Sequence, residues 1–191
     1  MKFLAPIVEG HGEVEAVPIL LHRIASAVEP NNPIRVNRPI RVKAGSFLND
    51  AGYFEKYVTL ASGKAAQENG SVLMILDCED QCPAHLGPRL LAQAQAVRLD
   101  ANYFVVLASR EYESWFLAAA ASLSGINGLP NQLVSPANAE EIRDAKGWLG
   151  KQMTGRYDPI THQSEFTREF DLEQACANHS FARLYRFVST I

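Results

Sequence analysis

The sequence predicts an α/β fold in which a mainly parallel, Rossmann-like sheet is flanked by helices and followed by a helical and irregular C-terminal extension. Three observations support this fold class. Strongly apolar runs alternate with stretches of helical periodicity, four such pairs follow one another, and polar segments rich in glycine or proline separate many of them. Parallel strands are continuously apolar because helices cover both faces of their sheet. We expect right-handed crossovers between consecutive strands.

The first strand and helix lie within residues 2–28. Residues 2–8 form a short apolar run, and residues 13–28 carry apolar side chains at helical spacing. Two glycines stand in the segment 9–12 between them. This pattern predicts a strand, a tight turn and a helix.

The second strand is predicted over residues 34–43, where apolar and polar side chains alternate. Pro39 indicates a position near a sheet edge, because proline cannot donate to a central ladder. We expect the apolar side chains on one face, and the other face is basic, with Arg35, Arg41 and Lys43. Such a face either contacts phosphates or protects an edge strand from aggregation. These three residues are therefore the candidate nucleic-acid-binding residues.

The remaining elements of the first part follow the same alternation. A helical pattern over residues 53–68 completes the second pair, and an apolar strand is predicted over residues 71–76. A polar loop then leads to a helix over residues 86–99. The fourth pair is a strand over residues 103–108 and a helix over residues 111–121.

After residue 121 the composition shifts to glycine, proline, asparagine and serine. We therefore expect an α/β domain over residues 1–121 and an extension over residues 122–191 that packs on it. Short helical patterns at residues 139–149 and 181–188 flank a polar stretch, residues 151–168, that we expect to be irregular. The extension also carries basic and aromatic side chains suited to closing over a nucleic acid or to packing on a partner: Lys146, Lys151, Arg156, Tyr157, His162, Arg168, Arg183, Tyr185 and Arg186.

The composition is that of an ordinary globular protein. The chain has 191 residues, 47% of them hydrophobic and 20% charged, which is a poor fit to disorder or a coiled coil. The net charge of -3 excludes a global basic field that would attract nucleic acid, so such binding would need a local patch or a metal. No apolar window suggests a membrane span and no signal peptide is apparent, so we expect a cytoplasmic protein with no membrane partner and three free thiols.

Carboxylates follow three of the predicted strands. In an open α/β sheet the ligand site lies outside the carboxyl ends of the strands, so these groups should meet there. Like charges brought together raise one another's pKa and cost stability unless a cation neutralises them. Oxygen-only ligands favour Mg²⁺ or Mn²⁺ over zinc. The carboxylates concerned are Glu9, Glu13, Asp77, Glu79, Asp80, Glu111 and Glu113.

The order of these motifs resembles the Toprim domain over roughly residues 1–120. The motifs are Glu9-Gly10-x-Gly12-Glu13, the pair Asp77-x-Glu79, and Ser109-x-Glu111. Glu13 and the last motif are most similar to Toprim nucleases of the OLD type (overcoming lysogenization defect). The resemblance implies Mg²⁺-dependent phosphoryl transfer, used for nicking, joining or priming nucleic acid. The sequence departs from the family at Glu79, where Asp is usual, and it carries no ATPase domain, so it also resembles small stand-alone Toprim-like proteins of uncharacterised function.

The resemblance implies roles for these residues. Glu9 would be the general acid/base or a metal ligand, and Asp77 and Glu79 would be the metal pair. Glu13 and Glu111 would bind a second metal ion. Asp80 is a further candidate ligand, and Glu113 either supports a ligand or replaces Glu111 as one.

Alternative interpretations remain for the same residues. A glutamate beside glycines can simply cap the next helix. Spacing alone also allows a zinc site from Cys78, Cys82 and His85 with Cys176 and His179, but the spacing is unusual. The function is therefore predicted as a metal-dependent nuclease, or alternatively as a non-catalytic module that binds a separately encoded ATPase. The oligomeric state stays open.

Overall fold

The computed structural model describes residues 2–191 and contains a parallel sheet of five strands. The strands are β1 (Lys2–Val8), β2 (Ile34–Val36), β3 (Ile40–Arg41), β4 (Ser71–Asp77) and β5 (Asn102–Ala108). Their order is β2-β1-β4-β5, and β3 also pairs with β1, beyond β2 along the same edge. All pairings are parallel, which confirms the α/β fold class.

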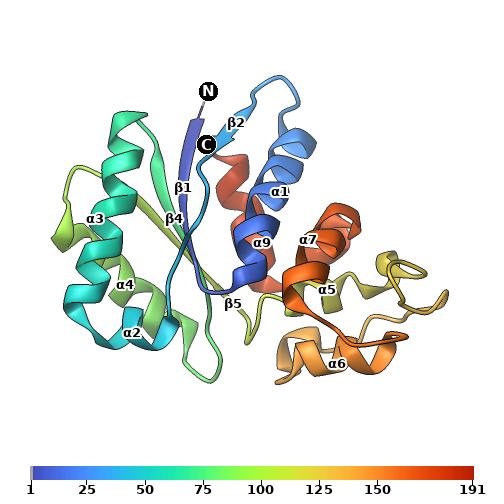
Figure 1. Ribbon diagram of the computed structural model, residues 1–191. Helices are drawn as coiled ribbons and strands as arrows, with labels where there is room; N and C mark the ends of the chain where they lie inside the picture. The colour runs from blue at the N-terminus through green and yellow to red at the C-terminus, as the bar shows by residue number, and fades with distance from the viewer. Residues whose placement is uncertain (1) are drawn as a thin grey trace.

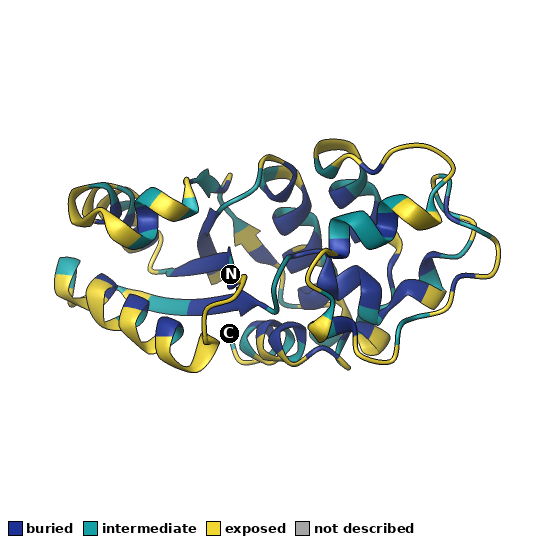
Figure 2. Ribbon diagram, turned by 90° about the horizontal axis from the view of Figure 1, so that it is seen from below, coloured by how far each residue is buried: buried dark blue, intermediate teal, exposed yellow. Residues whose placement is uncertain are grey.

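Helices cover both faces of the sheet (Figure 1). On one face lie α3 (Ala51–Gln67) and α4 (Pro83–Val97), with the short α2 (Ala44–Asn49) at their side; on the other lie α1 (His11–Val28) and α9 (His179–Ser189). Each face has its own hydrophobic cluster, and Figure 2 shows buried residues on the inner sides of the elements with exposed ones outside. None of the helices within residues 2–191 has both the length and the apolar character needed to cross a bilayer.

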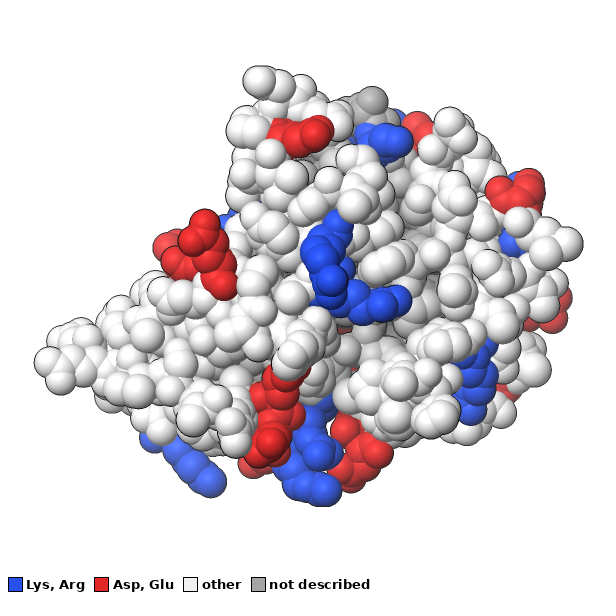
Figure 3. All heavy atoms as spheres, turned by 180° about the vertical axis from the view of Figure 1, so that it is seen from behind, with Lys and Arg blue, Asp and Glu red and all other residues white. Residues whose placement is uncertain are grey.

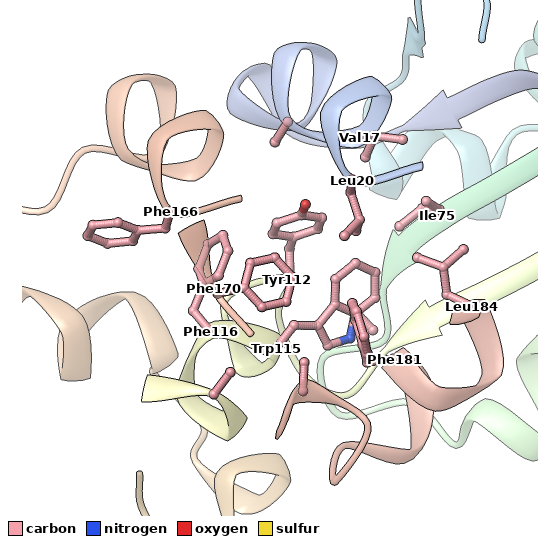
Figure 4. Close-up of a cluster of buried hydrophobic side chains, with 14 of the residues drawn as sticks. Val17, Leu20, Ile75, Tyr112, Trp115, Phe116, Phe166, Phe170, Phe181 and Leu184 are labelled. Carbon is pink, nitrogen blue, oxygen red and sulfur yellow. The ribbon is translucent and has the colours of Figure 1, made fainter. Parts of the chain in front are cut away.

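The C-terminal part packs closely on the α1 face. It contains α5 (Ser114–Ala118), α6 (Ala145–Gln152), α7 (Pro159–Glu169), α8 (Leu172–Ala175) and two short 3-10 turns (Ala120–Leu123 and Ala139–Glu141). Its aromatic side chains share one buried cluster with the sheet and α1, as Figure 4 shows. The largest members of the cluster are Tyr112, Trp115, Phe116, Phe166, Phe170 and Phe181, all almost fully buried. Burial of this much aromatic surface ties the C-terminal part to the sheet.

The edge strand β5 is covered by α9. The Arg183 side chain donates to the carbonyl oxygen of Val105 across 3.3 Å, and its guanidinium lies over the Phe104 ring. Phe104 also stacks on Phe187 at a centroid distance of 3.9 Å. Polar and apolar contacts from one helix therefore occupy part of the open edge of the sheet.

The prediction of one continuous strand over residues 34–43 is wrong. Two short strands stand there instead, because Pro39 has no N–H for the ladder and interrupts pairing with β1. The interruption also changes the face: Ile34 packs in the cluster on the α1 side, and Val42 packs in the cluster on the α3 side. The expected position at an edge of the sheet is confirmed.

Two predictions for the chain after β5 are also corrected. The stretch 151–168 is not irregular, because α7 begins at Pro159 inside it, with the Asp158 carboxylate accepting from the N–H of Ile160 at 3.0 Å. Aspartate followed by proline is a helix-start signal that the sequence does contain. The helix expected over residues 111–121 is limited to α5, because the chain first makes a turn in which Arg110 adopts a φ of 66°.

Candidate functional site

The predicted acidic residues lie around the carboxyl ends of β1, β4 and β5. In Figure 1, β1 runs downward from the N-terminus, so these ends lie toward the bottom, on the side where α6 is found. Glu9 follows β1 directly and Asp77 is the last residue of β4. Glu111 follows the end of β5 by three residues. Parallel pairing thus brings the three carboxylates to one edge of the sheet.

The turn after β1 is shaped by its two glycines. The Glu13 carboxylate turns back and accepts from the N–H of Glu9 at 3.2 Å. A Cβ on residue 10 would stand 2.7 Å from Glu13 Oε1, and one on residue 12 would stand 2.1 Å from the carbonyl oxygen of Pro159. Gly10 therefore makes room for the Glu13 carboxylate, and Gly12 lets α7 approach α1.

The loops after β4 and β5 hold each other. Asp77 Oδ1 accepts from the N–H of Tyr112 at 2.8 Å, and Cys78 Sγ accepts from the N–H of Arg110 at 3.3 Å. Glu79 and Arg110 both have positive φ values, 46° and 66°, and the N–H of Glu79 donates to the carbonyl oxygen of Arg110 at 3.1 Å. The position of Asp77 is fixed by these contacts, whereas Glu79 lies exposed at the rim.

A lysine from the C-terminal part lies among the carboxylates. Lys146 Nζ is 2.9 Å from Glu111 Oε1, 3.4 Å from Glu113 Oε2 and 3.7 Å from Asp77 Oδ2. The backbone N–H of Lys146, in the first turn of α6, also donates to Glu111 Oε2 at 3.1 Å. Glu111 therefore binds α6 through both a main-chain and a side-chain group.

Glu113 is fully buried and held by two neutral donors. Tyr157 Oη and Gln163 Nε2 each donate to Glu113 Oε1 at 2.9 Å. Buried carboxylates need such partners, because desolvation without them is costly. The network joins α7 and the segment before it to the acidic site, and it presents the second oxygen of Glu113 toward Lys146.

Burial and mutual repulsion shift the protonation of the cluster. Burial raises the pKa of Glu13 to about 7, with a smaller effect of the same sign from Glu113. Burial and then the Glu13 charge raise the pKa of Asp77 well above its ordinary value, against the effect of Lys146. Burial likewise raises the pKa of Glu9, and the neighbouring Glu79 adds to the shift. Burial alone would lower the pKa of Lys146, but Glu113, Asp77 and Glu111 together raise it.

Asp80 lies outside this cluster. Its exposed carboxylate forms ion pairs with Arg110 and, at 3.0 Å, with Arg143. These groups line a surface pocket of about 310 Å³ with Glu79 and Glu111. The pocket opens beside the acidic site, so the predicted ligand Asp80 is placed in contact with arginines at its entrance.

The basic residues of the second predicted strand are not equivalent. Arg35 forms a two-pronged ion pair with Glu68, at 2.7 and 3.1 Å, and its guanidinium lies over the Phe3 ring. Arg41 and Lys43 form no ion pair with a carboxylate of residues 2–191. The charge of Arg35 is thus balanced within the chain, while the other two remain available.

The sequence identified most but not all of this site. It singled out the carboxylates, and the structure brings Glu9, Glu13, Asp77, Glu79, Glu111 and Glu113 to one edge of the sheet. Lys146 and Tyr157 had been noted only among the basic and aromatic side chains of the extension. Gln163 was missed altogether, since nothing in its sequence context marks it. Cys78 and Cys176 are two of the residues considered for a zinc site. They pack against hydrophobic clusters on opposite faces of the sheet.

The donor atoms fit a hard divalent cation. Glu9 Oε2 and Glu113 Oε2 are buried with no hydrogen-bond partner among residues 2–191, and the ammonium of Lys146 lies 3.4 Å from Glu113 Oε2. The carboxylate oxygens gathered here are the donors that Mg²⁺ and Mn²⁺ prefer. Within the same residues no three His, Cys, Asp or Glu side chains are already arranged around one point as ligands. Lys146 occupies the space between Asp77, Glu111 and Glu113 instead.

Comparison with known proteins identifies the family to which the chain belongs. Neither the curated proteins nor the solved structures include a match to this chain. A family model described as a domain of unknown function, DUF4276, matches residues 8–189. The match includes the carboxylates after the strands as well as Lys146, Tyr157 and Gln163 of the C-terminal part. Because it spans nearly all of the sequence, the chain belongs to the DUF4276 family.

Proposed function

We propose that this protein is a cytoplasmic, metal-dependent nuclease that hydrolyses phosphodiester bonds of nucleic acid. The observation that carries the proposal is the gathering of carboxylates from three neighbouring strand ends at one edge of the sheet, with Lys146 as the ammonium ion among them. One ammonium does not balance that many carboxylates. The resemblance of the three motifs to the Toprim domain supports the same reaction class.

The excess negative charge favours a divalent cation. Glu9, Asp77 and Glu79 would hold Mg²⁺ or Mn²⁺, with Glu111 or Glu113 near a second ion. A metal held there would supply an activated water and would stabilise the charge that develops on the leaving oxygen. The orphaned oxygen of Glu9 supports its assignment as a ligand or as the acid/base group beside one.

The C-terminal part contributes positioning. Tyr157 and Gln163 fix the orientation of Glu113, and Glu113 and Glu111 in turn fix the Lys146 ammonium at the edge of the site. A group held by several partners loses little freedom when a substrate binds, which favours reaction. In this proposal the Lys146 ammonium offsets part of the negative charge of the carboxylates that it contacts.

A second candidate function is a non-catalytic module that binds a partner such as a separately encoded ATPase. The observation that favours it is the contact between Lys146 and three carboxylates, which partly satisfies the cluster without a metal. The two functions differ in whether the carboxylates take part in a reaction.

The deciding experiment measures nicking of supercoiled plasmid and cleavage of labelled RNA with Mg²⁺, with Mn²⁺ and with a chelator. We expect metal-dependent cleavage by the wild type and a loss of about 10²- to 10⁴-fold in Glu9→Gln, which keeps the volume but removes the charge. Glu15→Gln, on the exposed side of α1, is the matched control and should cleave normally. Equal cleavage by wild type and Glu9→Gln would exclude Glu9 from the reaction. A wild type that binds and cleaves neither substrate would leave the module as the better assignment.

A further inference from the structure

A second concave surface adjoins the acidic site at Lys146 and Tyr157. It has a volume of about 480 Å³ and is lined by Lys146, Gly147, Gly150, Gly155, Arg156, Tyr157 and Pro159. Two of its residues, Lys146 and Tyr157, also contact Glu113 of the acidic cluster. The concave surface, here called the α6 groove, is therefore continuous with the carboxylates.

The α6 groove combines exposed basic side chains at its wall and margin with main chain that carries no side chain. Arg156 lines the groove and is exposed, and Lys151, which directly follows the lining residue Gly150 in α6, is exposed next to it in the chain. Neither forms an ion pair with a carboxylate of residues 2–191. Gly150 and Gly155 present no side chain to the groove, so a ligand can approach the backbone closely.

Cations lie in both concave surfaces that adjoin the carboxylates. Arg110 and Arg143 line the pocket with Glu79 and Glu111, and Lys146 and Arg156 line the α6 groove. Figure 3 shows acidic and basic side chains alternating along the lower edge of the molecule, the side on which α6 lies in Figure 1. Elsewhere on the face in Figure 3, acidic and basic groups stand apart from one another among uncharged residues.

We infer that the α6 groove binds the phosphodiester backbone of a nucleic-acid strand and leads it to the carboxylates. The inference rests on the proposed function and names the surface that positions its substrate. Lys151 and Arg156 contact phosphates, the glycines give the sugar-phosphate chain room, and the phosphate to be cleaved lies beyond Lys146. A negatively charged strand needs such cations at its approach, because the carboxylates alone would repel it.

Binding in the α6 groove can be distinguished from binding at the basic residues of the second predicted strand. Arg41 and Lys43 also form no ion pair within residues 2–191, but they belong to β3 and the segment after it, near α2 and α3. Reversing two charges at either place changes the net charge equally. Only the change in the α6 groove should weaken binding strongly if the strand lies there.

The test measures fluorescence anisotropy of a fluorescein-labelled single-stranded DNA and of the RNA with the same sequence, without divalent metal. The variants of the full chain are Lys151→Glu with Arg156→Glu for the α6 groove, and Arg41→Glu with Lys43→Glu for the second predicted strand. The matched control is Lys56→Glu with Arg89→Glu, on the exposed sides of α3 and α4. We expect the α6 variant to bind at least about tenfold more weakly and its salt slope to fall by about 1.4, since each phosphate contact on a single strand contributes about 0.7. The control should bind nearly as the wild type. If the wild type binds one probe more tightly, that preference shows whether the groove favours deoxyribose or ribose.

The outcomes separate this inference from the proposed function. If the wild type cleaves with metal but the α6 variant binds and cleaves equally well, the groove is not the binding surface and the nuclease function stands. If the variant with Arg41→Glu and Lys43→Glu loses more affinity than the α6 variant, the strand follows β3 instead. A wild type that binds neither probe overturns the inference together with the nuclease proposal. If charge reversal disturbs folding, the variant Lys151→Gln with Arg156→Gln replaces it, once its melting temperature is shown to equal that of the wild type.

Discussion

Gly12 at the start of α1 and Pro159 at the start of α7 meet through their backbones, so closely that a Cβ on residue 12 would lie 2.1 Å from the Pro159 carbonyl oxygen. The contact joins the start of α1, which carries Glu13 and follows Glu9, to the helix that carries Gln163. The glycine in this motif is thus required by packing between distant parts of the chain.

Replacing Gly12 by alanine should therefore destabilise the protein. A backbone carbonyl cannot move aside as a flexible side chain can, so we expect a loss of about 1–3 kcal/mol, typical of overpacking. Thermal and urea unfolding measure it. Gly63→Ala is the matched control, because a Cβ there meets no atom within 4 Å and alanine favours the helix α3 by about 0.5–1 kcal/mol. Equal stability of the two variants would contradict the close contact.

Mn²⁺ binding should depend on Asp77. Asp77→Asn retains an oxygen that can accept from the N–H of Tyr112 but removes the negative charge, so we expect the affinity for Mn²⁺ to fall at least about tenfold. Isothermal titration calorimetry measures the affinity. Asp100→Asn, at an exposed ion pair with Arg98, is the control and should bind as the wild type. Unchanged affinity in Asp77→Asn would remove Asp77 from the metal site.

The stability contributed at Glu13 should depend on pH. Its pKa is about 7 in the folded chain, above the ordinary 4.5, so the folded state binds more protons between these values. The free energy of unfolding then falls as pH rises through this window, because a buried carboxylate becomes charged. Glu13→Gln lacks this titration, and its melting temperature should fall less than that of the wild type between about pH 5 and about pH 8. Glu15→Gln should follow the wild type, and a parallel fall in all three proteins would argue against the raised pKa.

The hydroxyl of Tyr157 should stabilise the fold through Glu113. Tyr157→Phe removes one of two donors to a fully buried carboxylate oxygen, which costs about 1–3 kcal/mol because the remaining group is less well satisfied. Urea unfolding measures the change, and the affinity for Mn²⁺ shows whether the orientation of Glu113 also matters. Tyr185→Phe is the control, since its hydroxyl forms no hydrogen bond with residues 2–191. Equal unfolding curves for the two variants would show that Gln163 alone suffices.

Sequence patterns predicted the elements whose periodicity is long and regular. β1, β4, β5, α1 and α3 lie within a few residues of their predicted ranges, because buried strands and amphipathic helices have distinct spacings of apolar residues. The carboxylates after the strands could be predicted for the same reason, since parallel strands end at a common edge.

The other contacts of the site depend on tertiary packing. Lys146 and Gln163 reach Glu111 and Glu113 from 35 and 50 residues away along the chain, and no local periodicity records such a meeting. The break before β3 was also missed, because the alternation of apolar and polar side chains resumes in phase at Ile40 after the interruption at Arg38 and Pro39. In these cases the sequence shows the chemical type of each side chain, but the residue that it contacts is set by the tertiary fold.

The contact between α9 and β5 has a consequence for the solubility of shortened chains. The outer side of β5 carries main-chain groups that can pair with a strand from another molecule, and Arg183 already engages the carbonyl of Val105 there. A chain cut before α9 would lose that arginine together with Phe187, and it would present an apolar edge to its neighbours. Such a fragment should associate into sheets between molecules, so the last helix protects the protein from aggregation.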